Sequence, residues 1–189
     1  MYKALQSNEM SLKIYKHAPA HLFVDEHVYF FTGAVYQKKK LLVSDTAKQL
    51  FLKYLFHFIE KYGWKLLEWV VLDNHYHFLA KINCNKYMPV MINSLHKTSA
   101  FHIKKILGIE QKPFWYQYWD RCIRNEEDYH RTAMYILYNP VKHGYVEDLK
   151  DYPYSSFLDR FQDDEMQLRA DFMKYRPQDI KAYDAVDGF

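Results

Sequence analysis

Hydrophobic and polar positions along the first half of the chain predict a strand, a helix and two further strands. Residues 28–36, VYFFTGAVY, are β-branched and aromatic and are bounded by charged residues, which is typical of a strand. Ser44 is a good N-cap, and apolar residues then recur at helical spacing as far as Gly63. Residues 64–82 again have the composition of a strand, which we expect to be broken near Asp73.

The second half of the chain predicts two longer helices separated by an irregular segment. One helix is expected over residues 89–107, ending at Gly108. Residues 110–124, EQKPFWYQYWDRCIR, show no clear period and predict irregular structure with at most a short strand. Asn125 is suited to cap a third helix, and Pro140 is expected to end it, because proline disfavours helical conformation in the residue before it.

The order of these elements predicts an α+β sandwich with one mainly antiparallel sheet and helices on one face. We expect the main domain to cover residues 24–158, after an N-terminal extension over residues 1–23. Residues 159–189 are polar and acidic, so they form either a helix docked on the domain or a loose tail.

Composition narrows the class of protein. No run of 18 uncharged apolar residues exists, so no membrane span is predicted, and the first residues lack the apolar segment of a secretory signal. Cys84 and Cys122 are far apart, which suits a reducing cytoplasm and favours neither a disulfide framework nor a cysteine-based zinc site. We therefore expect a cytoplasmic protein with no membrane partner.

Charge and aromatic content leave two interpretations open. The net charge is +3 with a pI near 8.6, which is weak support for a nucleic-acid partner. The chain holds 18 Tyr, 13 Phe and 4 Trp. These residues either build an aromatic core or also supply surfaces on which unpaired bases stack.

The segment LDNHYHF contains the most distinctive candidate chemistry. Side chains alternate across a strand, so His75 and His77 point to one face and Tyr76 to the other. Their backbones are about 7 Å apart, which suits two neighbouring ligands of a divalent ion. The same spacing also fits two histidines on a solvated strand, or two core histidines bonded to backbone carbonyls.

The third helix offers a further ligand and a nucleophile. Tyr135 and Asn139 are four residues apart and share a helix face, although Asn139 precedes proline and is expected at a frayed helix end. Two histidines and an amide oxygen would leave a divalent ion electrophilic, with Mg²⁺ or Mn²⁺ as candidates. Tyr135 could then attack a phosphate, or it could be a core tyrosine, and Tyr138 and Tyr129 are rivals for the role.

At these residues the sequence resembles a known family, the REP-associated tyrosine transposases. The resemblance covers roughly residues 24–157, and its most specific pieces are HYH, YILYNPVKHG and YPYSSF in this order and spacing. These proteins are the domesticated branch of the bacterial single-tyrosine HUH transposases, which are IS200-like and act on single-stranded DNA.

The resemblance implies a ferredoxin-like, RRM-like sandwich and a metal-dependent endonuclease that cleaves and rejoins hairpin DNA through a 5′-phosphotyrosine. By matching positions, the metal ligands are His75 and His77 with Asn139 as the third, and the nucleophile is Tyr135. Many members have proline where this chain has Asp73. That carboxylate could touch the metal or a histidine, but we favour a simple turn residue.

Basic and aromatic residues near these motifs are candidates for DNA contacts. Lysines on the second helix could equally form a solvated face, whereas two arginines flank the proposed catalytic helix and are favoured. The candidate phosphate contacts are Arg121, Arg124, Lys97, Lys104, Lys105, Lys142 and His143. The candidate stacking residues are Trp115, Trp119, Tyr116 and Tyr118.

Two other classes of protein remain as alternatives. One is a catalytically silent protein that binds single-stranded nucleic acid in a sequence-specific manner. The other is a structural zinc protein, which the lack of paired cysteines disfavours. A monomer is favoured over a dimer, although family members of both kinds are implied by the resemblance.

Overall fold

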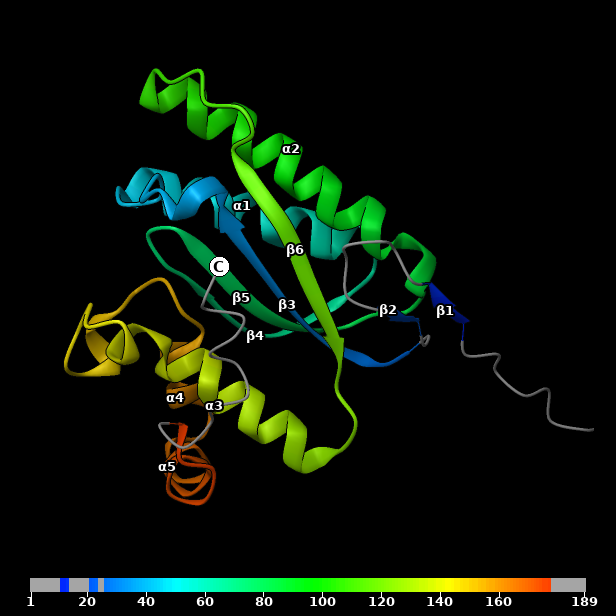
Figure 1. Ribbon diagram of the computed structural model, residues 1–189. Helices are drawn as coiled ribbons and strands as arrows, with labels where there is room; N and C mark the ends of the chain where they lie inside the picture. The colour runs from blue at the N-terminus through cyan, green and yellow to red at the C-terminus, as the bar shows by residue number, and fades with distance from the viewer. Residues whose placement is uncertain (1–10, 14–20, 24–25, 178–189) are drawn as a thin grey trace, which may run out of the picture.

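A four-stranded antiparallel sheet forms the centre of the protein, as Figure 1 shows for this computed structural model, which describes residues 11–13, 21–23 and 26–177. The strand order is β4-β5-β3-β6. The strands are β3 (Val28–Val35), β4 (Lys65–Val71), β5 (His75–Lys81) and β6 (Trp115–Cys122). A separate two-stranded sheet pairs β1 (Ser11–Lys13) with β2 (His21–Phe23). The rest of the predicted N-terminal extension lies outside the described residues.

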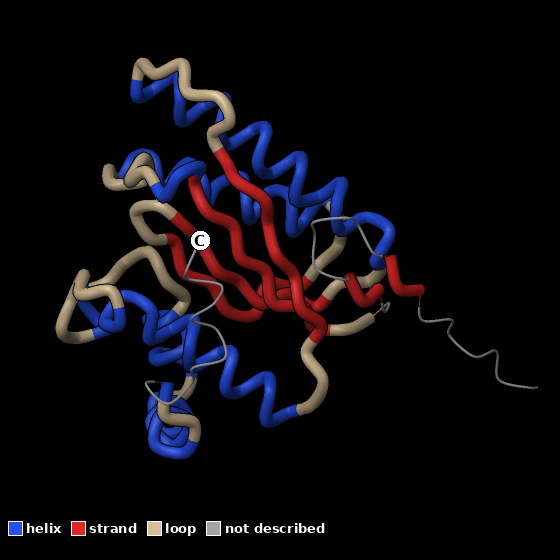
Figure 2. Tube along the Cα trace, viewed as in Figure 1, coloured by secondary structure: helices blue, strands red, loops and turns tan. Residues whose placement is uncertain are grey.

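Helices cover both faces of the sheet (Figure 2). They are α1 (Asp45–Lys61), α2 (Met88–Leu107), α3 (Glu126–Lys142), α4 (Phe157–Asp163) and α5 (Glu165–Lys174). Short 3₁₀ turns occur at Tyr36–Lys38, Asn85–Tyr87 and Leu149–Asp151. From β3 to β6 the order is βαββαβ, which is the ferredoxin-like order that the resemblance implied. In the described part of the chain, no helix is long and apolar enough to cross a membrane.

The predicted helix boundaries are largely confirmed because local side chains set them. The Ser44 Oγ accepts a hydrogen bond from the Ala47 amide at 3.3 Å, and the Asn125 Oδ1 accepts one from the Asp128 amide at 2.9 Å. Both bonds satisfy amides at the first turn of a helix. Gly108 follows α2 in a left-handed conformation with φ of 65°, which a glycine adopts without a steric penalty.

The expectation that all helices lie on one face of the sheet is wrong. Tyr76 faces α1, where its ring lies 4.7 Å from that of Phe51. His77, one position along β5, faces α3, where its ring lies 5.5 Å from that of Tyr135. The sheet is therefore apolar on both faces, and the third helix covers the face that α1 and α2 leave open.

The irregular segment predicted over residues 110–124 is instead mostly an eight-residue strand, β6. Its pairing with β3 shifts register between Gly33 and Val35, which breaks the simple alternation of its side chains. Gly33 itself lies under the ring of Tyr76, and a Cβ atom there would come within 2.6 Å of the Tyr76 hydroxyl. A glycine is therefore required at this position for the ring to pack.

Pro140 does not end α3, contrary to the expectation from sequence. The helix continues to Lys142, and the carbonyls of Asn139 and Pro140 accept hydrogen bonds from the amides of His143 and Tyr145 at 3.0 and 2.9 Å. Inside a helix, proline removes one hydrogen bond and its ring crowds the carbonyl four residues earlier, which costs about 3 kcal/mol. Tertiary packing of α3 against the sheet outweighs the local preference of the residue before proline.

The YPYSSF segment and the helices after it close the edge of the sheet at β4. The Val71 amide donates to the Tyr154 carbonyl, and the Ser156 amide donates to the Trp69 carbonyl, both at 2.9 Å. Arg160 of α4 then pairs with the buried Glu68 of β4 and, at 2.7 Å, with Asp171 of α5. The segment from Asp159 as far as residue 177 is thus docked, while residues 178–189 lie outside the described part.

Candidate active site

His75 and His77 lie together on the face of the sheet that α3 covers. Their ring centroids are 5.0 Å apart and the rings are inclined by 73°. Tyr76, between them in sequence, points to the opposite face and donates or accepts a hydrogen bond with His96 of α2 at 2.8 Å. The alternation along β5 therefore presents two imidazoles to one side of the sheet, as their spacing predicts.

Tyr135 of α3 packs directly against this pair. Its ring centroid lies 5.5 Å from that of His77 and 6.3 Å from that of Phe30, and the side chain is only 2% exposed. The Lys142 ammonium lies 4.9 Å from the centre of the Tyr135 ring. A cation over the face of an aromatic ring at this distance makes a favourable cation–π contact, which fixes Lys142 beside Tyr135.

Asn139 lies within α3 and is fully buried, which corrects the expectation of a frayed helix end. Its Nδ2 donates to the Tyr135 carbonyl at the long distance of 3.4 Å. Its Oδ1 is buried and accepts no hydrogen bond from the described residues. An unsatisfied amide oxygen costs about 1–3 kcal/mol, so this atom is poised to meet a ligand.

His143, which the sequence suggested only as a phosphate contact, continues the line of Tyr135 and Asn139 one residue past the end of α3. Tyr135, Asn139 and His143 follow one another at four-residue spacing and so share a helix face. Tyr135 contacts His77, and the His143 ring lies 5.1 Å from that of His75. Asn139 lies midway between Tyr135 and His143 in sequence and so belongs to the same face of α3, which is turned toward the two imidazoles. The same four-residue spacing, extended past Asn139, is the signal that would have found His143.

These donors fit a hard divalent ion. Two neutral imidazoles and an amide oxygen suit Mn²⁺ or Mg²⁺ and leave coordination positions open for phosphate oxygens. Among the described residues, no group of three His, Cys, Asp or Glu side chains could hold a metal. A site built on His75 and His77 would therefore need the buried Asn139 amide oxygen as its third protein donor.

Asn74 fixes the orientation of His75. The Asn74 Nδ2 donates to the Lys38 carbonyl at 3.1 Å, which directs Oδ1 toward the His75 Nδ1 at 2.7 Å. An amide oxygen can only accept a hydrogen bond, so Nδ1 of the neutral imidazole carries the proton. The lone pair then resides on Nε2, which is the nitrogen left to bind an ion.

Asp73, the residue found where many family members have proline, is engaged with α1. Its carboxylate accepts a hydrogen bond from the Lys48 ammonium at 2.8 Å, and both side chains are nearly buried. The Asp73 carbonyl accepts from the Leu42 amide at 2.8 Å. The carboxylate therefore anchors the turn before the histidines, in line with the favoured interpretation of a turn residue.

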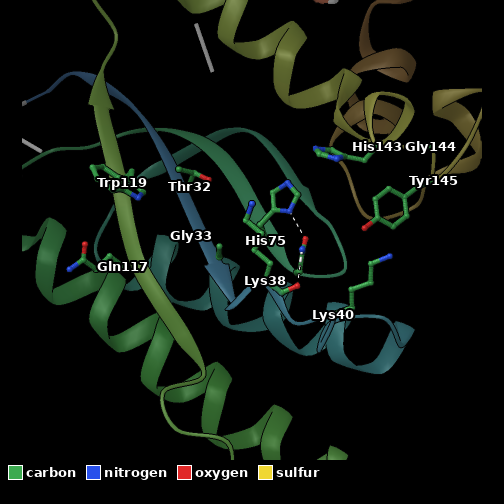
Figure 3. Close-up of a pocket in the computed structure, with 12 residues that line it drawn as sticks. Thr32, Gly33, Lys38, Lys40, His75, Gln117, Trp119, His143, Gly144 and Tyr145 are labelled. Atoms are coloured by element: carbon green, nitrogen blue, oxygen red, sulfur yellow. Dashed lines mark hydrogen bonds between the residues drawn. The ribbon is translucent and has the colours of Figure 1, made fainter. Parts of the chain in front are cut away.

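A pocket of about 460 Å³ opens beside His75 (Figure 3). In this view His75 and His143 face one another, and β6 forms the other side with Gln117 and Trp119. Lys38 and Lys40, in the loop after β3, also line the pocket. The lining residues are Thr32, Gly33, Ala34, Lys38, Lys40, Asn74, His75, Gln117, Trp119, His143, Gly144 and Tyr145.

The two tryptophans proposed to stack bases lie on opposite faces of the sheet. Trp119 lines the pocket, as a stacking residue should. Trp115 is 7% exposed, packs against Phe51 at 5.3 Å, and donates from Nε1 to the Ser99 hydroxyl at 3.0 Å. Its proposed role is therefore wrong, because the register shift of β6 turns this indole into the core. The other two candidates are less buried: Tyr116 is exposed and Tyr118 is half-buried.

The candidate cations are spread over different parts of the molecule. Arg121 binds both oxygens of Asp128 at 2.8 and 2.6 Å and also donates to the Thr132 hydroxyl, so it joins β6 to α3. Arg124 is exposed in the loop between these elements. The second-helix lysines belong to α2, which packs on the face opposite the histidines; these residues are Lys97, Lys104 and Lys105.

The rival tyrosines lie elsewhere. Tyr129 is hydrogen-bonded to Arg160, and burial, together with the nearby Glu68 carboxylate, raises the pKa of its phenol. Tyr138 is half-buried and is one helical position before Asn139, so it points about 100° away from it. Of the three candidates, Tyr135 has a described contact with His77.

Known proteins resemble this chain in sequence and in fold. The sequence profile of the family described as "Transposase IS200 like" matches residues 23–136, more than half of the chain. A protein of Haemophilus influenzae, named as a REP-associated tyrosine transposase, is 30% identical over 151 residues, which cover 71% of this chain and 82% of that protein. The chain therefore belongs to the IS200-like transposase family.

Within that family, its relatives are REP-associated tyrosine transposases. One from Escherichia coli K12 is 46% identical over 41 residues, which are 22% of this chain and 25% of that protein. A solved structure of a REP-associated tyrosine transposase bound to a REP hairpin has the same fold, with a TM-score of 0.62 and 24% identity over 78% of this chain and 84% of that one. The resemblance read from the sequence is thus confirmed.

Proposed function

We propose that this transposase is a metal-dependent endonuclease that cleaves and rejoins single-stranded hairpin DNA through a 5′-phosphotyrosine on Tyr135. The observation that carries the proposal is the contact of Tyr135 with His77, on the same helix face as the buried Asn139, whose Oδ1 accepts no hydrogen bond from the described residues. α3 thus supplies a phenol and an amide oxygen, and β5 supplies two imidazoles on the face of the sheet that α3 covers. This is the arrangement needed to attack a phosphate held by a divalent ion.

The residues that would hold the ion are His75, His77 and Asn139. A bound Mn²⁺ or Mg²⁺ would polarise the scissile phosphate and offset the charge that develops on its oxygens. Asn74 holds the proton on the His75 Nδ1, so that Nε2 remains a donor of electrons. The Asp73–Lys48 ion pair fixes the turn that carries both residues.

Tyr135 would supply the nucleophile. At a free pKa of about 10, only roughly one phenol in a thousand is ionised at pH 7, and a bound divalent ion would raise that fraction. The phenolate oxygen forms a bond to phosphorus, and the bond from phosphorus to the 3′ oxygen breaks. That oxygen takes a proton from water and leaves as a free 3′-OH, while the 5′ end stays on Tyr135. Attack by another 3′-OH reverses the step and rejoins DNA.

A single-stranded substrate suits the surroundings of the site. The pocket beside His75 combines Lys38 and Lys40 with the indole of Trp119. Cations that follow a phosphate backbone and aromatic faces that stack bases are the two features of single-strand binding. The relative of known structure was solved with a REP hairpin, which supports the same class of partner for this chain.

The test is to trap the covalent adduct. Labelled hairpin DNA with an unpaired flank is incubated with the protein and Mn²⁺, and a band that resists denaturation is mapped to a peptide. We expect the adduct on Tyr135, and Tyr135→Phe should lose both adduct and cleavage while still binding DNA. Tyr138→Phe, on another face of α3, is the matched control and should retain both. Binding without any adduct in the wild-type protein would instead indicate a catalytically silent DNA-binding protein.

A further inference from the structure

We infer that Tyr36 and Tyr116 form a slot for one unpaired base of the DNA strand that lies in the pocket beside His75. This inference rests on the function proposed above. A second cavity of about 270 Å³ lies at the end of β3, next to that pocket. It is lined by Ala34, Val35, Tyr36, Gln37, Lys38 and Tyr116. Its size is just below the usual range for drug-sized ligands, which suits a single planar base.

The two rings of the slot are held in place by the sheet. Their centroids are 6.2 Å apart and the rings are inclined by 40°, so they form an open wedge. The Tyr36 amide donates to the Phe114 carbonyl at 2.8 Å, which ties the end of β3 to the start of β6. Tyr116 is 44% exposed although its ring is fixed on a strand. An exposed, oriented aromatic face is the surface on which an unpaired base stacks.

The slot is continuous with the candidate active site. Ala34 and Lys38 line both cavities, so a strand in the larger pocket passes directly to the slot. Thr32 pairs with His77 across the sheet, and Tyr36 follows four residues later, about 13 Å along β3. A base in the slot would therefore belong to the strand close to the cleaved phosphate.

The charges around the slot fit a nucleic-acid strand and not an apolar segment. Lys38 and Lys40 line the larger pocket and are exposed. Gln37 and Lys38 have φ values of 56° and 53°, the left-handed region that L residues seldom adopt, so the chain turns sharply at this point. The turn brings the Lys38 carbonyl to Asn74, whose Nδ2 donates a hydrogen bond to it at 3.1 Å. A base and its phosphate would meet an aromatic ring and a cation together.

The inference is tested with hairpin DNA whose unpaired flank carries the fluorescent base 2-aminopurine at one position at a time. We expect the wild-type protein to quench one position, and Tyr116→Leu and Tyr36→Leu to abolish that quenching. Affinity for the flanked hairpin should fall roughly 5- to 100-fold, the range for losing one stacked base. Tyr116→Phe keeps the ring and should bind as the wild type does.

A second surface pair of tyrosines provides the matched control. Tyr62 and Tyr87 have ring centroids 6.1 Å apart at an inclination of 48°, and Tyr87 is 43% exposed at the start of α2, beyond the far end of β5. Tyr87→Leu should leave quenching and affinity unchanged, and an equal loss in this variant would overturn the inference.

Two outcomes separate this inference from the proposed function. If Tyr116→Leu and Tyr36→Leu quench and bind the flanked hairpin as the wild type does, the slot is not a base site, while the proposed function stands. If the wild-type protein binds neither the flanked nor the blunt hairpin, the proposed function is wrong, and the inference about the slot is wrong with it.

Discussion

At the scale of single residues, each imidazole of the pair is held by a different neighbour. Phe30 stacks on the His77 ring at 5.5 Å and 22°, and Asn74 bonds to the His75 Nδ1 at 2.7 Å. Asn74 is in turn fixed by the Lys38 carbonyl. The two rings are therefore oriented by packing and hydrogen bonding on a rigid strand, which is what a preorganised ligand pair requires.

Removing either histidine should separate catalysis from DNA binding. His75→Ala or His77→Ala is expected to abolish cleavage that depends on Mn²⁺, because two donors are too few to hold the ion in place. Affinity for the hairpin should stay within several-fold, since phosphate and base contacts supply most of it. Calorimetric titration of Mn²⁺ and a gel-shift assay measure the two effects, and unchanged cleavage in either variant would remove the metal role.

Asn74 should tune the affinity for metal without touching it. Asn74→Leu removes the acceptor for the His75 Nδ1, so we expect Mn²⁺ affinity to fall about 10- to 100-fold, as for other partners of metal-ligating histidines. Asn83→Leu is the matched control, because the Asn83 amide donates only to the Gly63 carbonyl at the other end of β5. Equal Mn²⁺ titrations for Asn74→Leu and wild type would mean that His75 is oriented by packing alone.

At the scale of elements, α2 is joined to the sheet by a buried polar pair in an aromatic setting. The Tyr76 hydroxyl is hydrogen-bonded to the His96 Nε2 at 2.8 Å, and the His96 ring stacks on Trp115 at 4.9 Å. Burial lowers the pKa of His96 to about 3 and raises that of Tyr76 well above its usual value. Both groups are therefore neutral at pH 7, and their pairing costs no buried charge.

The low pKa of His96 predicts a loss of stability in acid. In the unfolded chain His96 is protonated below about pH 6.5, whereas in the folded chain it is protonated only below about pH 3. The free energy of unfolding should therefore fall by up to about 1.4 kcal/mol per pH unit as the pH drops through this window. Urea unfolding at several pH values measures the slope. His96→Gln should reduce the slope, while His57→Gln, at an exposed position of α1, should leave it unchanged.

At the scale of the whole molecule, the two faces of the sheet carry different kinds of side chain. The face toward α1 and α2 is an aromatic core, in which Phe31 and Phe78 stack at 4.7 Å. The face toward α3 carries the histidines, Trp119 and the pocket. The histidines and the pocket thus lie on one side of the four strands, and the Phe31–Phe78 stack lies on the other.

This arrangement predicts a preference for single strands. The protein should cut a hairpin with an unpaired flank and spare the same sequence in full duplex, because stacking on Trp119 requires bases that are splayed out. Denaturing gels of end-labelled substrates with Mn²⁺ measure both reactions under one condition. Equal cleavage of the duplex would contradict this prediction and would mean that recognition does not require unpaired bases.

The sequence by itself determined the features that depend on local periodicity. Alternation along a strand puts His75 and His77 on one face, and four-residue spacing puts Tyr135 and Asn139 on one side of a helix. The caps at Ser44 and at Asn125 also followed from the chemistry of neighbouring residues. These relations hold wherever the segment folds, because they involve residues that are close along the chain.

Only the tertiary structure decided which elements meet. Nothing local indicates that α3 crosses the histidine face. Pro140 stays within its helix because packing across the sheet outweighs a preference of one residue. The register shift beside Gly33 sends Trp115 to the core while Trp119 remains at the pocket. Each of these outcomes depends on contacts between segments far apart in sequence, which periodicity does not encode.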